Sequence, residues 1–138
     1  MKEYYLAKIK CVRETDQGLL KQVTEQYLVD SVSFTETEAI IYDKLSESVR
    51  GDFKVTHISI SNVTDVFHYD DQDVWFKAKV QYFAVDPEAG KEKKVVLYML
   101  VTAKDVPQAH ERIRESLSNM LVSFEIPDIV ETKILEVF

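Results

Sequence analysis

The chain has 138 residues, 46% of them apolar, and a formal net charge of −7, which suits one compact domain or two halves that share a core. No apolar run approaches the ~20 residues that a bilayer crossing needs, and the sequence begins without a signal-peptide pattern. We therefore expect a protein without membrane contacts. Its single cysteine, Cys11, excludes an internal disulfide framework and favours the cytoplasm.

The sequence repeats itself after 71 or 72 residues. The clearest matches pair Tyr4–Ile9 with Trp75–Val80, Leu28–Val29 with Leu100–Val101, and Asp65–Phe67 with Glu136–Phe138. The offset changes only in the first turn and just after the helix, where a one-residue insertion costs little. We infer that residues 4–67 and 75–138 are two copies of one unit. The connector 68–74 joins them and holds three aspartates, so it carries much of the acidic excess.

Each copy begins with two predicted strands joined by a turn. Residues 4–13 and 19–30 alternate in polarity and are rich in β-branched and aromatic residues, and Gly18 supplies a positive φ in the turn between them. In the second copy, the strand from Trp75 ends in a turn where Pro87 sets the backbone angle. One face of each first strand is apolar and is expected to pack under a helix: Tyr5, Ala7, Ile9 and Cys11, matched by Phe76, Ala78, Val80 and Tyr82.

A helix and a third strand complete each copy. Capping boxes start both helices, Ser33 with Glu36 and Asp105 with Gln108. The positions expected to face the core are Phe34, Ile41, Leu45 and Val49 in the first helix, and Val106, Ala109, Ile113, Leu117, Met120 and Leu121 in the second. The third strands are expected at 53–63 and 124–135, where Pro127 indicates an edge strand or a strand beginning.

These elements predict an α+β fold: a tandem duplication of a ββαβ unit, with antiparallel-dominated sheet or sheets, two helices and pseudo-two-fold symmetry. The third strand of each unit can pair beside the first, with the helix covering one face. One shared sheet and two smaller sheets are both compatible with the sequence.

No arrangement of residues typical of an enzyme is readable. His57, His68 and His110 fall on a strand, the connector and a helix, and the sequence holds no phosphate loop or zinc-ligand spacing. The connector 68–74 lacks the spacing of a calcium loop and is expected to be a solvated acidic linker. Cys11 is expected to be a buried structural thiol. We therefore expect no enzyme, no catalytic residue, no metal and no cofactor.

A pattern of lysines and aromatic residues follows the other face of the two first strands. Its members are Tyr4, Lys8, Lys10, Trp75, Lys77 and Lys79. Because aromatic rings stack on bases and lysines neutralise phosphates, this pattern predicts single-stranded nucleic-acid binding. The same lysines also serve to keep a half-exposed sheet soluble, and the acidic net charge disfavours tight nonspecific binding.

Tyr27–Glu36, Trp75–Val80 and the closing Glu136–Phe138 resemble a family of short uncharacterised proteins of gut Bacteroidetes and their phages, catalogued as a domain of unknown function. The resemblance covers nearly the whole chain. It implies a bacterial or phage protein of the cytoplasm, and it brings no catalytic residues.

The leading hypothesis is a non-enzymatic binding module that presents two related surfaces to a partner protein or to a second copy of itself. The acidic net charge and the aromatic residues near strand ends, Tyr4, Trp75 and Phe138, favour a protein partner. Single-stranded nucleic-acid binding is one alternative. The other is capture of a small anionic ligand between the repeats by converging lysine or tyrosine side chains.

Overall fold

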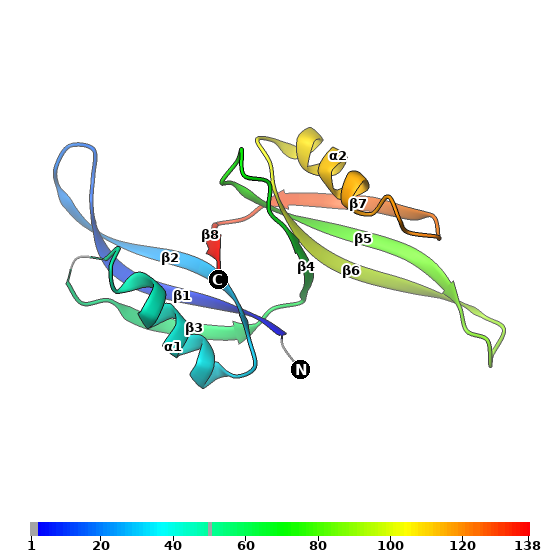
Figure 1. The fold of residues 1–138 in the computed structure, drawn as a ribbon, viewed down its shortest axis with the longest axis horizontal. Coiled ribbons are helices and arrows are strands. Elements are labelled where there is room, and N and C mark those ends of the chain that lie inside the picture. Colours follow the sequence, from blue (N-terminus) through cyan, green and yellow to red (C-terminus); the bar gives the residue numbers. More distant parts are fainter. Residues whose placement is uncertain (1–2, 50) are drawn as a thin grey trace. The chain divides into compact units, whose positions relative to one another are not determined.

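The structure is a computed structural model that describes residues 3–49 and 51–138. It has the predicted α+β fold, with two helices and two four-stranded sheets that are mostly antiparallel (Figure 1). The chain divides into two compact units: unit 1 comprises Met1–Ser61 with Lys133–Phe138, and unit 2 comprises Asn62–Thr132. Neither helix in the described part of the chain is long and apolar enough to cross a membrane.

Unit 1 is a sheet in the order β3-β1-β2-β8 with helix α1 on one face (Figure 1). Its elements are β1 (Glu3–Glu14), β2 (Leu20–Ser31), α1 (Phe34–Leu45), β3 (Lys54–Ile60) and β8 (Ile134–Val137). Strand β1 pairs antiparallel with β2 and β3, whereas β8 pairs parallel with β2. The predicted face of β1 is confirmed, because Ala7, Ile9 and Cys11 are buried in one core with Ile41 and Leu45 of α1.

Unit 2 repeats this arrangement in the order β4-β6-β5-β7. Its elements are β4 (Val63–Phe67), β5 (Trp75–Val85), β6 (Glu92–Thr102), α2 (Val106–Ser116) and β7 (Phe124–Glu131). Its core is built on the same pattern, with Phe76, Ala78 and Val80 of β5 buried against Ala109 and Ile113 of α2. Pro127 lies on β7, which is an edge strand as expected.

The third strand of each repeat is broken in two. The sequence predicted single strands over 53–63 and 124–135, but Ser61–Asn62 and Thr132–Lys133 interrupt them. The first half of each, β3 or β7, pairs beside the first strand of its own repeat, as expected. The second half pairs elsewhere, which the uniform β pattern of the sequence did not indicate.

These second halves are exchanged between the sequence repeats. Strand β4 ends the first repeat and pairs with β6 of the second, while β8 ends the second repeat and pairs with β2 of the first. The two pairings have the same register and the same irregularity: Gln26 opposes Ile134 and Tyr27 opposes Glu136, just as Tyr98 opposes Val63 and Met99 opposes Asp65. The compact units therefore differ from the stretches 4–67 and 75–138 by one short strand each.

Three residues predicted to face the core are exposed instead. Phe34 and Val106 occupy the first turn of their helices and are 51% and 46% exposed, while Leu121 is fully exposed because α2 ends before it, at Ser116. The ring of Phe34 packs edge-on against Tyr5, with 5.2 Å between the ring centroids. Two of these positions thus lie in the first turn of a helix and the third lies beyond the end of one.

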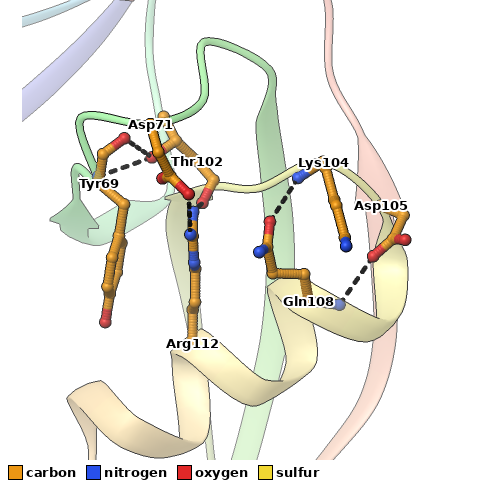
Figure 2. A network of polar contacts seen from close by, with 7 residues as sticks. All are labelled: Tyr69, Asp71, Thr102, Lys104, Asp105, Gln108 and Arg112. Carbon is orange, nitrogen blue, oxygen red and sulfur yellow. Dashed lines mark hydrogen bonds and ion pairs between the residues drawn. The ribbon is translucent and has the colours of Figure 1, made fainter.

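Both predicted capping boxes are confirmed. Ser33 Oγ accepts a hydrogen bond from the backbone N–H of Glu36 at 3.0 Å, and Asp105 Oδ1 accepts one from that of Gln108 at 2.9 Å (Figure 2). In return, the side chains of Glu36 and Gln108 accept hydrogen bonds from the backbone N–H one residue before the cap. The duplication thus preserves the device that fixes where each helix begins.

The core of unit 2 gives a direct test of this packing. Ile113 is fully buried, so we expect Ile113→Ala to lower the free energy of unfolding by about 2–5 kcal/mol through lost contacts and a cavity. Val106 lies on the same helix but is 46% exposed, and Val106→Ala is expected to cost less than about 1 kcal/mol. Urea titration of both variants checks this, and equal losses would contradict the packing described.

Candidate functional site

The six residues of the predicted nucleic-acid face divide between the two units. Tyr4, Lys8 and Lys10 lie on β1 of unit 1, and the other three lie on β5 of unit 2. Trp75 is 4% exposed and stacks on His68, with 5.6 Å between the ring centroids. Its ring therefore presents no free face to a base, although the sequence pattern suggested one.

Two more of the expected contact residues are engaged within their units. Lys77 Nζ donates a hydrogen bond to Asn62 Oδ1 at 2.6 Å and lies 4.9 Å from the centroid of the Tyr98 ring. Burial lowers the pKa of Lys77. Phe138, expected near a strand end as a partner contact, stacks on Tyr27 at 5.2 Å. These side chains serve the fold of their units.

Strand pairing in unit 1 brings two further basic residues beside Lys8 and Lys10. Lys8 lies opposite His57 and Lys10 lies opposite Lys54, on the face of the sheet that α1 does not cover. We call these four residues the basic face. Lys10, Lys54 and His57 are exposed and Lys8 is half-buried.

The lysines of the basic face have no acidic residue directly opposite them in the described strands. On the β2 side, Lys8 pairs with Gln26 and Lys10 pairs with Thr24, both uncharged. The ion pairs found among residues 3–49 and 51–138 include none of the three lysines. Like charges directly opposite each other destabilise a sheet, so the Lys10–Lys54 pair carries a cost that the fold itself does not require.

The equivalent positions of unit 2 have the opposite charge balance. There Lys79 lies opposite Asp128, and Gln81 lies opposite Glu125. The side chain of Gln81 donates a hydrogen bond to Glu125 Oε2 at 3.1 Å. Two copies of one sheet thus keep the same backbone pairing, while one presents three lysines and a histidine and the other one lysine and two carboxylates.

Unit 1 also holds a polar cluster at the border of its core. Arg13 donates hydrogen bonds to both carboxylate oxygens of Glu25, at 2.9 and 3.1 Å, and to the backbone oxygen of Ser48 at 2.8 Å. Tyr27 Oη donates to Glu25 Oε1 at 2.9 Å. Burial of the Glu25 carboxylate opposes ionisation, but the hydrogen bonds from Arg13 and Tyr27 outweigh it and hold the pKa of Glu25 below its ordinary value.

This cluster explains the state of the lone cysteine. Cys11 is buried, as expected, and burial together with the charge of Glu25 raises the pKa of its thiol. A raised pKa leaves less of the reactive thiolate at neutral pH. The polar groups of the cluster hydrogen-bond to one another, and through Arg13 they connect the end of β1 to Ser48 in the chain after α1.

Two residues of the connector 68–74, Tyr69 and Asp71, hold it to β6 and α2 (Figure 2). Arg112 of α2 donates hydrogen bonds to Asp71 Oδ2 at 2.7 Å and to the backbone oxygen of Thr102 at 2.8 Å, and its guanidinium lies 4.4 Å from the centroid of the Tyr69 ring. Thr102 Oγ1 in turn bonds the backbone N–H and C=O of Tyr69. Arg112 is 9% exposed. The acidic residues of the connector, Asp70, Asp71 and Asp73, are exposed, as the sequence led us to expect, and Asp71 also holds the connector to α2.

No metal site emerges from the structure. Within the described ranges, 3–49 and 51–138, no three His, Cys, Asp or Glu side chains are grouped so that they could hold an ion. The alternative hypothesis of a small anionic ligand held between the repeats by lysine or tyrosine side chains stays untested.

Comparison with known proteins places the chain in a family without assigning it an activity. The family described as "Domain of unknown function (DUF4494)" matches residues 3–138, and the chain belongs to this family. A cysteine–tRNA ligase from Chelativorans sp. (strain BNC1) is 26% identical over 130 residues, which are 88% of this chain but only 24% of that protein. The chain thus spans about a quarter of the length of this relative. No solved structure matches significantly.

The anchored connector leads to a pH-dependent prediction. The hydrogen bond from Arg112 holds the pKa of Asp71 below its ordinary value. The carboxylate therefore contributes stability that is present above the ordinary pKa of about 4 and is lost as the pH falls through the lower folded-state value. We expect the parent protein to be more stable than Asp71→Asn at about pH 6, with the difference shrinking below about pH 4. Denaturant titration across this range checks it, and an undiminished difference at about pH 2 would contradict the pairing.

Proposed function

For this member of the DUF4494 family, we propose a non-enzymatic binding module that binds an acidic segment of a partner protein on the basic face of unit 1. The observation that carries the proposal is the charge contrast between Lys8, Lys10, Lys54 and His57 and their equivalents in unit 2. Both sets occupy the same positions of the same fold, so the fold does not dictate either charge.

The arrangement of the basic face suits an acidic ligand. Residues directly opposite each other on antiparallel strands have Cβ atoms about 4.5–5.5 Å apart, which is shorter than the Debye length of ~8 Å at physiological ionic strength. Lys8, Lys10 and Lys54 therefore act on a ligand together. The net charge of the chain is −7, so a local cluster of positive charge also orients an acidic partner.

A protein segment suits this face better than a nucleic acid does. Single-stranded nucleic-acid binders combine basic residues with aromatic rings on which bases stack. Tyr4 is the one tyrosine on the helix-free face of the described strands of unit 1; it lies opposite Asp30 and is half-buried. The basic face therefore offers charge without a stacking platform.

Nucleic-acid binding is the second candidate function. It is favoured by the lysines themselves and by the partial likeness to a protein named as a cysteine–tRNA ligase. Because that likeness covers only 24% of the ligase, we include RNA as a test ligand beside the acidic peptide. The third candidate, a small anionic ligand bound between the repeats, has no described residue that favours it.

We also infer the setting of the protein from its sequence. The resemblance to proteins of Bacteroidetes and their phages suggests a bacterial or phage origin. One buried thiol and no possible internal disulfide suit the reducing cytoplasm.

Lys54→Glu tests the proposed function without weakening the fold. The substitution places at position 54 the residue that unit 2 has at the equivalent position, Glu125, and it turns the Lys10–Lys54 repulsion into an attraction. We expect the variant to be as stable as the parent or more stable by about 0.2–1 kcal/mol. We expect its affinity for a fluorescein-labelled acidic peptide, measured by polarisation at low and physiological salt, to fall at least tenfold.

The matched control is Lys93→Glu, which makes the same charge change on an exposed position of β6 in unit 2, opposite the uncharged Ala84. Its affinity for the acidic peptide should stay within about twofold of the parent. Equal losses in both variants would assign binding to net charge alone and contradict the proposed function. Tighter binding of single-stranded RNA or of tRNA than of the peptide would favour the second candidate.

A further inference from the structure

Strand β3 is an edge strand that borders the basic face. In the sheet order β3-β1-β2-β8, strand β1 is its single neighbour in the described structure. Lys54 and His57 belong to β3, so its outer backbone edge runs directly beside basic side chains. An edge strand presents unpaired N–H and C=O groups on which another extended chain can pair.

The equivalent edge of unit 2 carries a protective device that β3 lacks. Both edge strands contain a bulge in their pairing with the first strand, between Lys8 and Ile9 in unit 1 and between Lys79 and Gln81 in unit 2. At the bulge β7 has Pro127, whereas β3 has Thr56 at the equivalent position. Proline removes an N–H donor and fixes the backbone, which is one way that proteins discourage pairing at a sheet edge.

Two independent differences between the copies thus converge on one place. The face beside β3 is basic, whereas the equivalent face of unit 2 carries two carboxylates. Strand β3 has no proline, whereas the equivalent edge strand β7 has Pro127. We propose that the acidic segment binds as an additional extended strand on the outer edge of β3. This inference rests on the proposed function and specifies how the partner binds.

The two faces of β3 determine which sequence such a strand needs. Lys54, His57 and Ser59 lie on the helix-free face, whereas Ile58 and Ile60 lie on the helix side. Side chains of an added strand alternate between the same two faces, about 4.8 Å from those of β3. The partner segment therefore alternates acidic residues, which meet Lys54 and His57, with apolar residues, which meet Ile58 and the 57%-exposed Ile60.

A second copy of the chain fits this edge poorly. Strand β3 contains no acidic residue, so a second β3 strand offers Lys54 no carboxylate in any register, and a register that brings the basic side chains of the two copies face to face adds repulsion. Like charges on neighbouring strands destabilise the pairing. Charge complementarity thus selects a different, acidic chain as the occupant.

Labelled peptides of three designs test the inference on the unmodified protein. The first alternates four glutamates with four valines, and the second has the same eight residues in two blocks, so both carry the same charge. Polarisation should show the alternating peptide binding at least tenfold more tightly, because only it can present one acidic and one apolar face. A dimer formed by pairing of two β3 edges would appear in analytical ultracentrifugation as an apparent molecular mass that rises with protein concentration. That result would overturn the choice of an acidic partner chain as the occupant.

The third design is the alternating peptide with N-methyl groups on every second residue, and it is made as two peptides, one for each methylation pattern. In a strand, alternate N–H groups point to the same side, so one methylation pattern should abolish binding and the other should leave it nearly unchanged.

The outcomes separate this inference from the proposed function. If alternating and block peptides bind equally and both methylation patterns are tolerated, while Lys54→Glu still loses affinity, the proposed function holds and strand addition is overturned. If neither peptide binds at low salt, the proposed function fails as well.

Discussion

The exchange of short strands between the repeats is the constraint on which the rest of the structure depends. Strand β8 covers the outer edge of β2 in unit 1, and β4 covers that of β6 in unit 2. The pairing of β8 is closed by backbone hydrogen bonds from Phe138 N to Leu28 O at 2.8 Å and from Asp30 N to Phe138 O at 2.9 Å. With those edges occupied, the longer edge strands are β3 and β7. Where a partner strand can pair is thus decided by how the repeats are connected.

The two copies have kept their backbone and changed their polar side chains. Registers, bulges and helix caps agree between the units, yet each unit has an arginine network that the other lacks. Arg13 of unit 1 corresponds to Ala84, and Arg112 of unit 2 corresponds to Ile40. Change of polar side chains on an unchanged backbone also accounts for the basic face in one copy and the carboxylate-rich face in the other. Divergence after duplication therefore makes each unit an internal control for the other, because a feature that the fold requires is present in both.

Much of the fold was predictable because patterns in the sequence determine it. The hairpins, both capping boxes and the apolar face of β1 depend on residues close in sequence, and the duplication is visible as a repeat of the sequence itself; all are confirmed. The strand exchange was not predictable from the sequence, because β2 and β6 are equivalent strands and local sequence does not determine with which of them a short strand pairs. The candidate site was predictable in part: Lys8 and Lys10 were found, but Lys54 and His57 join them only through long-range pairing across a bulge. The burial of Trp75 and the anchoring of the connector by Arg112 likewise come from tertiary contacts.

Amide hydrogen exchange with the alternating glutamate–valine peptide tests the central claim most directly, because it reports where the peptide pairs. We expect the peptide to slow exchange within residues 54–60 and to leave exchange within residues 124–131, the proline-bearing edge strand, unchanged. Slower exchange in both segments, or in the β5–β6 hairpin alone, would contradict the claim that charge and a free edge together make β3 the binding strand.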